Sequence, residues 1–360
     1  NYVGGVIGKN EVEITGTESD GVGVANSGTV IATAGGAGGI IGENDAHISY
    51  AVMKNEGEVH GNASENSTTQ ENGTGGIIGV NGKNMTITNS SMMNTLKGKV
   101  TGISNVGGII GINHGTVTGG RDKNNGFYQH QIYNNGTIQA GSYDEKTGTL
   151  NHEVNGSENI GGLIGLNTGK LTAGYNTGVI SAGNPNVGGI AGTNSGTIDQ
   201  VFTNVMTENG QNQTITGASN VGGIVGNNAN GATIFNAYTA QGTTVNGTTN
   251  FGLIAGTNEG TISNVYGASA DQLVGSGTKA TNGYGMSNQE NDYKGFDFTG
   301  NDNKSAVWKI YEDRTNPLLK VFLTKASVKE DALKKFVYNG QNQLDIKKLI
   351  DDKNLTNQKD

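Results

Sequence analysis

A block of two glycines, two apolar residues and a third glycine recurs along this chain. Seven complete copies are present, at residues 4–8, 38–42, 75–79, 107–111, 161–165, 188–192 and 222–226. A degraded eighth copy occupies residues 252–256. Successive first glycines are 27 to 37 residues apart, except for one interval of 54 residues between 107 and 161. A period near 30 residues indicates a stacked repeat architecture, and the long interval indicates an inserted loop or an extra turn.

A second block follows the first and predicts a turn that opens a strand. It reads asparagine, any residue, glycine, a polar residue and then valine or isoleucine, at residues 26–30, 113–117, 194–198 and 258–262. Asparagine and glycine both tolerate positive φ, which tight turns often require. Alternating apolar residues follow at 234–238 and 262–266. One repeat is therefore predicted to contain three strands separated by two turns.

The composition favours strands over helices and over disorder. The chain of 360 residues has 62 glycines but only 2 prolines, and the glycines do not recur at every third position as collagen requires. Isoleucine and valine number 54 against 14 leucines, and branching at Cβ favours strands. The net charge of −8 gives no indication of nucleic-acid binding. No cysteine and no apolar run of membrane-spanning length is present. We expect the chain to carry no signal peptide and to be part of a larger protein.

These features predict a right-handed, single-stranded parallel β-helix. A repeat of this length buries too little apolar surface to fold alone, whereas stacked repeats form a continuous apolar interior. Strands about 4.8 Å apart would make about ten coils into a rod roughly 50 Å long. Asparagines at equivalent corners are expected to form hydrogen-bonded ladders along the axis. A β-propeller fits poorly, since its blades need four antiparallel strands and about 40 residues.

The pattern changes near residue 300, which divides the chain into three predicted parts. Residues 1–300 form the repeats. Residues 301–325 contain the single tryptophan, Trp308, and two short apolar strands around Pro317, and are predicted to form a terminal coil or C-terminal capping segment. Residues 326–360 are either a linker or the start of a further domain.

The glycine block and its Asn-x-Gly-Thr follow-up resemble the GLUG repeat of bacterial surface proteins. Such repeats occur in secreted adhesins similar to filamentous haemagglutinin, which are exported by two-partner secretion, and in accessory regions of some surface peptidases. Residues 308–319 look like the segment that ends such arrays, and residues 336–340 resemble the start of an MBG-type immunoglobulin-like repeat. The resemblance implies a right-handed β-helix, a location on a Gram-negative-type cell surface with the outer membrane beneath it, and a role in attachment and virulence.

The long interval from 107 to 161 concentrates aromatic and polar side chains and is the candidate ligand-binding loop. Exposed aromatic rings there are expected to stack on sugars, and the competing interpretation is a tolerated insertion on one face of the solenoid. Asp122, Asp144 and Glu145 lie in the same interval, but acidic residues are scattered rather than paired as catalysis would need. The candidate binding residues are Arg121, Phe127, Tyr128, His130, Tyr133 and Tyr143.

The sequence thus predicts a non-enzymatic stalk and adhesion region with no cofactor and no metal site. Its five histidines lack ligand spacing, and the three Thr-x-Thr motifs do not recur in every repeat, so no flat ice-binding array is expected. The expected partner is a host-surface glycan or protein, bound by a monomeric rod within a larger secreted chain. The alternative is an accessory or catalytic β-helix of a surface hydrolase that cleaves polysaccharide or protein.

Overall fold

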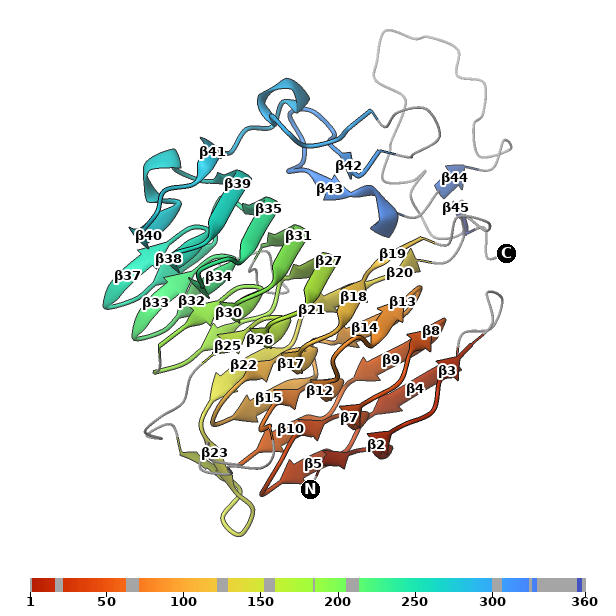
Figure 1. The fold of residues 1–360 in the computed structure, drawn as a ribbon. Helices are drawn as coiled ribbons and strands as arrows, with labels where there is room; N and C mark the ends of the chain where they lie inside the picture. Colours follow the sequence, from red (N-terminus) through yellow and green to blue (C-terminus); the bar gives the residue numbers. More distant parts are fainter. Residues whose placement is uncertain are drawn as a thin grey trace, which may run out of the picture.

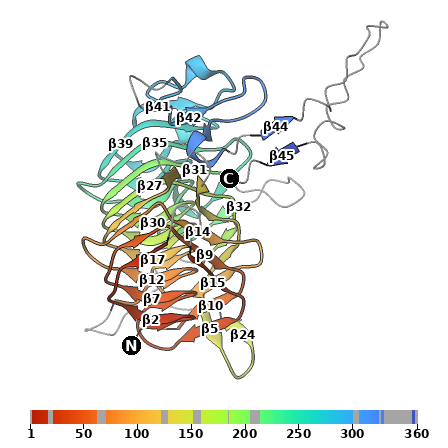
Figure 2. The same cartoon turned by 90° about the vertical axis from the view of Figure 1, so that its right-hand side faces the viewer.

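The computed structural model describes residues 2–16, 22–62, 71–121, 129–151, 159–183, 185–204, 214–299, 306–323, 326–328 and 355–357. Within them the chain winds upward in successive coils whose strands stack along one axis (Figures 1 and 2). The equivalent strands of neighbouring coils pair in parallel and in register. The molecule is therefore a parallel β-helix, as the repeat predicts.

Four stacked sheets form the walls of the helix, so the prediction of three strands per coil was wrong. Sheet A contains β1 (Val3–Gly4), β6 (Ala37–Gly38), β11 (Thr74–Gly75), β16 (Val106–Gly107), β25 (Ile160–Gly161), β29 (Val187–Gly188), β33 (Ser219–Gly222) and β37 (Thr249–Gly252). Sheet B contains β2 (Ile7–Asn10), β7 (Ile41–Asn44), β12 (Ile78–Asn81), β17 (Ile110–Asn113), β26 (Ile164–Asn167), β30 (Ala191–Asn194), β34 (Val225–Asn228), β38 (Ala255–Asn258) and β40 (Val274–Gly277). The nine rungs of sheet B span about 40 Å at the usual strand spacing.

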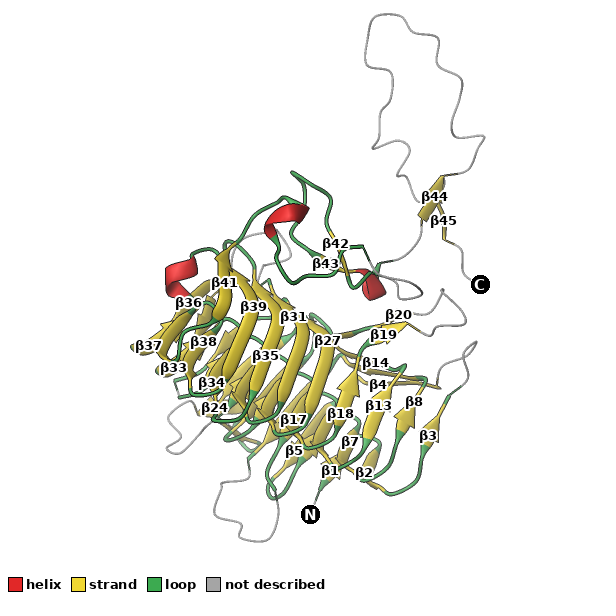
Figure 3. Cartoon of the chain, turned by 45° about the horizontal axis from the view of Figure 1, so that its top comes forward, coloured by secondary structure: helices red, strands yellow, loops and turns green. Residues whose placement is uncertain are grey.

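Sheet C changes along the axis. In the first coils it consists of two separate columns of strands. One column contains β3 (Ile14–Thr15), β8 (Ile48–Ser49), β13 (Thr86–Thr88) and β18 (Thr116–Thr118). The other contains β4 (Val22–Asn26), β9 (Ala51–Asn55), β14 (Ser91–Asn94) and β21 (Ile132–Asn134). From β27 (Lys170–Asn176) onward the columns merge into long strands, namely β31 (Thr197–Thr203), β35 (Thr233–Thr239), β39 (Thr261–Gly267) and β41 (Thr281–Gly285) (Figure 3). The strands predicted at 234–238 and 262–266 correspond to β35 and β39.

Sheet D closes each coil. It contains β5 (Thr29–Ala32), β10 (Glu58–Gly61), β15 (Lys99–Gly102), β22 (Thr137–Ala140), β28 (Ile180–Ser181), β32 (Thr214–Thr216) and β36 (Thr244–Asn246). Four antiparallel pairs lie outside the coils, formed by β19 (Gly120–Arg121) with β20 (Gln129–His130), β23 (Ser142–Asp144) with β24 (Thr149–Asn151), β42 (Trp308–Lys309) with β43 (Leu318–Leu319), and β44 (Ala326–Val328) with β45 (Leu355–Asn357). The helical turns are η1 (Ala270–Gln272), η2 (Glu290–Asp292) and η3 (Lys320–Phe322).

The interior consists of two apolar columns rather than the single one expected. Sheets B and C enclose one, in which residues such as Ile78, Ile87 and Ile110 are fully buried. Sheets A and D enclose the other, with Val59 and Val106 among its members. Burying an aliphatic side chain of this size contributes roughly 1.5–3 kcal/mol. Each coil adds a layer to both columns, which explains why single repeats need their neighbours.

The paired glycines make the sharp bend between sheets A and B possible. A Cβ atom on Gly38 would lie 1.8 Å from the carbonyl oxygen of Ile41, and the equivalent distance at Gly75, to Ile78, is 1.9 Å. No side chain fits at such a distance, so the block tolerates only glycine there. The repeated glycines are corners of the coil, as the sequence indicates.

Buried asparagines form the predicted ladders. The long ladder lies at the end of sheet B, where side-chain amides of successive coils are joined at 2.7–2.9 Å; it comprises Asn10, Asn44, Asn81, Asn113, Asn167, Asn194, Asn228 and Asn258. The short ladder lies at the end of sheet C, with distances of 2.6–2.8 Å, and comprises Asn26, Asn55, Asn94, Asn134 and Asn176.

The Asn-x-Gly turn forms as predicted, but for a different reason. The side-chain oxygen of Asn194 accepts a hydrogen bond from the backbone nitrogen of Gly196 at 3.2 Å, and Asn258 does the same for Gly260. These are Asx turns, in which the side chain rather than a positive φ makes the bend. Positive φ falls instead on asparagines that precede the glycine block, such as Asn105 and Asn186.

The C-terminal segment packs along the side of the rod. Residues 286–299 and 306–323, here called the covering segment, lie over the outer face of sheet C (Figures 1 and 3). The two apolar strands predicted around Pro317 are the pair β42 and β43. The end of the column between sheets B and C is closed by Leu273 and Val274 after η1. At the end of the other column, Phe251 remains 52% exposed.

Candidate functional site

The long interval from 107 to 161 is one coil with two inserted hairpins, which settles the choice between an insertion and an extra turn. The hairpin of β19 and β20 interrupts sheet C between β18 and β21, and the hairpin of β23 and β24 follows β22 of sheet D. The second hairpin lies beside β10 and β15, far from the first (Figures 1 and 2). The insertions therefore leave the rod on different sheets.

His130 and Tyr133 belong to the sheet C side. His130 is buried, with its ring edge-on to that of Tyr50 at 6.0 Å. Tyr133 begins a stack of nearly parallel rings on the outside of sheet C, in which Tyr133, Tyr175, Phe202 and Tyr238 follow one another at 5.0–5.2 Å. One face of the Tyr133 ring is therefore occupied by Tyr175. The predicted stacking of Tyr133 on a sugar has to use its other face.

The remaining predicted residues do not complete this site. Tyr143 lies on β23, on the sheet D side of the rod. Arg121 is placed through its backbone in β19, while Phe127 and Tyr128 lie outside the described residues, as does Asp122. The structure thus separates His130 and Tyr133 from Tyr143, and it does not gather the candidate binding residues into one surface.

The covering segment buries the upper part of the aromatic stack. Trp308 is 1% exposed, lies against Phe296 at 4.6 Å between ring centroids, and contacts Tyr238 at 5.9 Å. The Tyr238 hydroxyl donates a hydrogen bond to the carbonyl oxygen of Pro317 at 2.6 Å. Burial raises the pKa of Tyr238 well above its ordinary value and raises that of Tyr293 to about 12. This cluster is a small lateral core, which anchors the segment to the rod.

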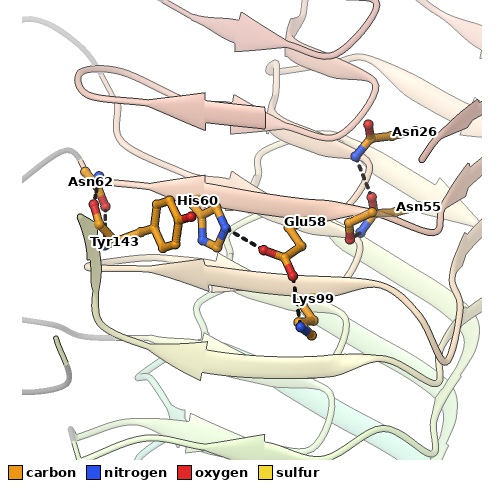
Figure 4. Close-up of polar contacts among 8 residues, drawn as sticks. Asn26, Asn55, Glu58, His60, Asn62, Lys99 and Tyr143 are labelled. Atoms are coloured by element: carbon orange, nitrogen blue, oxygen red, sulfur yellow. Dashed lines mark hydrogen bonds and ion pairs between the residues drawn. The ribbon is translucent and has the colours of Figure 1, made fainter. Parts of the chain in front are cut away.

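The polar cluster that stands out lies under the hairpin of β23 and β24 (Figure 4). The rings of His60 and Tyr143 are stacked, with centroids 3.9 Å apart and planes 8° from parallel. His60 Nε2 lies 3.2 Å from Glu58 Oε2, and Lys99 Nζ lies 2.9 Å from Glu58 Oε1. The Asn62 amide donates to the Tyr143 carbonyl at 2.6 Å and accepts from the Tyr143 backbone nitrogen at 2.8 Å.

The electrostatics of this cluster are set by burial and by Lys99. The hydrogen bond from Lys99 lowers the pKa of Glu58 and keeps the carboxylate ionised. Burial lowers the pKa of His60, against the opposing effect of Glu58, and favours the neutral imidazole. His60 is only 4% exposed, although it points outward from β10 beside the inward-facing Val59. A buried histidine on the outer face of a sheet requires a covering element, and Tyr143 supplies it.

Sequence reasoning missed this cluster because its members come from three coils. The available signal was the alternation of Glu58, Val59 and His60, which places two titratable groups on the outer face of one strand. Lys99 is 41 residues from its partner Glu58, and Tyr143 is 83 residues from its partner His60. The register of sheet D pairs Glu58 with Lys99, and the inserted hairpin brings Tyr143 onto His60. Among the described residues, no group of three metal-ligating side chains is present, and no helix is long and apolar enough to cross a membrane.

In comparisons with known proteins, no family model matches the chain, and neither does any curated protein or solved structure. The resemblance to the GLUG repeat remains a prediction from the sequence.

Proposed function

We propose that this chain is the rod-forming stalk and adhesion region of a secreted bacterial surface protein, with no catalytic role of its own. The proposal rests on the continuity of the rod: sheet B pairs in register through nine rungs, and the long ladder joins eight buried amides along them. A rod with every inner strand paired on both sides holds a binding surface at a fixed distance from its anchor.

The two inserted hairpins are the regions where a receptor contact is easiest to test. Neighbouring coils show how the chain closes without them, since β13 and β14 are joined through Asn89 and Ser90, and β28 and β29 through residues 182–186. Insertions of this kind in solenoids commonly carry binding functions. The proposed partner is a glycan or protein on a host cell, bound by hairpin side chains that are exposed on the rod surface.

The test uses the full chain and two variants on a glycan array and on host cells. In one variant, residues 119–130 are replaced by the short link of residues 89–90, since Thr116 and Ile132 align with Thr86 and Met92. In the other, residues 141–159 are replaced by the link of residues 183–186, since Gln139 and Ile160 align with Ser181 and Val187. We expect the full chain to bind and one replacement to abolish binding while the rod stays folded by circular dichroism. Release of new reducing or unsaturated sugar ends from a polysaccharide would instead support the hydrolase alternative. Equal binding by all three proteins would contradict a role for the hairpins.

A further inference from the structure

The hairpin of β23 and β24 is attached to the rod by few contacts. It begins at Gly141, whose φ of +152° is a backbone conformation that favours glycine. A Cβ atom there would lie 2.7 Å from the carbonyl oxygen of Asn151, so the two hairpin strands are close together at this hinge. The Asn62 amide holds the Tyr143 backbone by two hydrogen bonds, in the way that a neighbouring strand would. The ring of Tyr143 then rests on His60.

His60 is enclosed in a way that suits only its neutral form. Nε2 faces Glu58 Oε2 at 3.2 Å and carries the hydrogen that this carboxylate accepts. Nδ1 is buried and has no hydrogen-bond partner among the described residues. Protonation would place a second N–H at Nδ1, and a charged donor that is buried without an acceptor disfavours the docked state. The docked hairpin therefore discriminates against the imidazolium.

The groups that face His60 act in different directions, and their balance favours the neutral ring. Glu58 on the same strand attracts a proton to it, while Lys99 on β15 repels one. Tyr143 from the hairpin presents an uncharged ring, and the neighbours of His60 in register, Ile31 on β5 and Thr101 on β15, are uncharged as well. Burial outweighs the attraction of Glu58 and lowers the pKa of the imidazole.

We propose that the hairpin of β23 and β24 is a pH-sensitive lid, docked on sheet D while His60 is neutral and released when His60 is protonated in mildly acidic surroundings. Because the docked imidazole has a lowered pKa and the undocked one returns to about 6.5, docking is strongest above that value and weakens as the pH falls through it. Release uncovers the outer face of β10 and β15.

Hydrogen exchange of the amides of residues 142–151, corrected for the intrinsic exchange rate at each pH, measures docking in the full chain. If docking requires a neutral His60, the equilibrium constant for docking of the hairpin falls by at most about 30-fold between about pH 7.5 and pH 5. The expected result is a fall in protection that approaches this limit in the hairpin, with the amides of β12 and β17 in sheet B unchanged. Hairpin protection that does not depend on pH would overturn the proposal.

Two substitutions separate titration from packing. His60→Phe keeps a ring against Tyr143 but cannot titrate, and His60→Leu removes both properties. We expect both variants to show protection that is constant over this pH range, whatever its level, so that a weakly docked variant remains informative. His114→Phe removes a histidine at a different corner of the rod, bonded to Glu71 and Thr168, and should retain the pH response. The same pH response in His60→Phe and His60→Leu would show that another group controls the lid.

Discussion

The first coils and the last coils of this rod share one backbone plan but are held together differently along sheet C. In the first coils sheet C is split into two columns, and the short ladder of buried amides runs along its end from Asn26 to Asn176. In the last coils the strands are continuous, and Thr203 and Thr239 occupy the positions of the ladder asparagines. There the aromatic stack and the covering segment bind the coils from outside.

The difference shows that the two devices perform separate tasks. An amide ladder fixes the register between coils, because each buried amide needs a partner at one height. Aromatic rings contribute apolar burial and tolerate small displacements, so they suit the attachment of a separate segment. The long ladder continues through both regions, which keeps the register of the last coils after the short ladder ends.

We expect the stabilities of the first and last coils to differ most at alkaline pH. Burial raises the pKa of Tyr175, Tyr238 and Tyr266 above the ordinary value and that of Tyr293 to about 12. In the first coils burial raises the pKa of Tyr133 and that of Tyr2, the latter to about 12. Each raised pKa keeps a proton in the folded form that the unfolded chain loses above about pH 10. Folding therefore becomes less favourable as the pH rises above this value, and four such rings act together in the last coils.

Trp308 fluorescence and far-ultraviolet circular dichroism, followed together from about pH 9 to pH 12, test this order. We expect the fluorescence change of the covering segment to come first and the loss of strand signal later. A strand signal that is lost first, or a single coincident transition, would show that the first coils are no more resistant than the last.

The next largest effect is expected from Trp308→Ala. This side chain is 1% exposed and packs between Phe296 and Tyr238. Removing a buried tryptophan typically costs about 3–5 kcal/mol, and we expect the covering segment to lose its exchange protection while the coils of β12 and β17 retain theirs. Tyr311→Ala is the control, since Tyr311 is 53% exposed in the same segment. Loss of protection in the first coils would mean that the two regions unfold as one unit.

Asn228→Ala is expected to lower the free energy of unfolding by about 2–3 kcal/mol. Asn228 is fully buried, accepts from the Asn194 amide at 2.9 Å and donates to Asn258 at 2.8 Å. The cost stays moderate because Asn194 also donates to Gly196, and Asn258 also accepts from Gly260. The neighbouring Asn227 is only half-buried on the same strand, so Asn227→Ala in the same urea titration is a matched control. An equal loss of unfolding free energy in the two variants would indicate that the ladder contributes no more to stability than ordinary strand packing does.

Much of this architecture follows from the sequence because it is local and repeated. The glycine corners, the parallel stacking and the ladders are encoded by residues that recur at the same place in each coil. The sequence did not predict the fourth sheet or the second apolar column, because strands of sheet A such as β1 and β6 contain only two residues and leave no alternating pattern. The merging of the columns in sheet C follows from a shorter link: five residues separate Ile87 from Met93, whereas three separate the aligned Leu171 and Tyr175. The bend with positive φ occurs in both kinds of coil, at Asn89 and at Ala173.

The candidate site was less predictable, for a physical reason. Richness in aromatic and polar residues located the insertions within 107–161, yet it could not indicate that they leave the rod on two different sheets. The ring faces of Tyr133 and Tyr143 are partly occupied by Tyr175 and His60. The first pair is set by the register of sheet C and the second by the docking of an inserted hairpin, and neither follows from sequence proximity. Whether the insertions bind a receptor stays a prediction.

Tyr175→Leu should give the smallest effect and the finest test of the comparison between the two regions. The Tyr175 ring lies between Tyr133 and Phe202 at 5.2 and 5.0 Å, in coils where the short ladder still joins Asn134 to Asn176 at 2.7 Å. Leucine keeps most of the apolar contact and loses the ring stacking, which is worth about 1 kcal/mol.

The informative partner of this variant is Phe202→Leu, one coil further on, where Thr203 has replaced the ladder asparagine. If the amides carry the register, Tyr175→Leu should change only the free energy of unfolding in urea. Phe202→Leu should in addition weaken exchange protection in β31 and β35, because there the rings and the covering segment support sheet C without the short ladder. An equal local loss of exchange protection in both variants would show that the short ladder does not compensate for a missing ring. The two regions would then differ in composition but not in the interactions that stabilise sheet C.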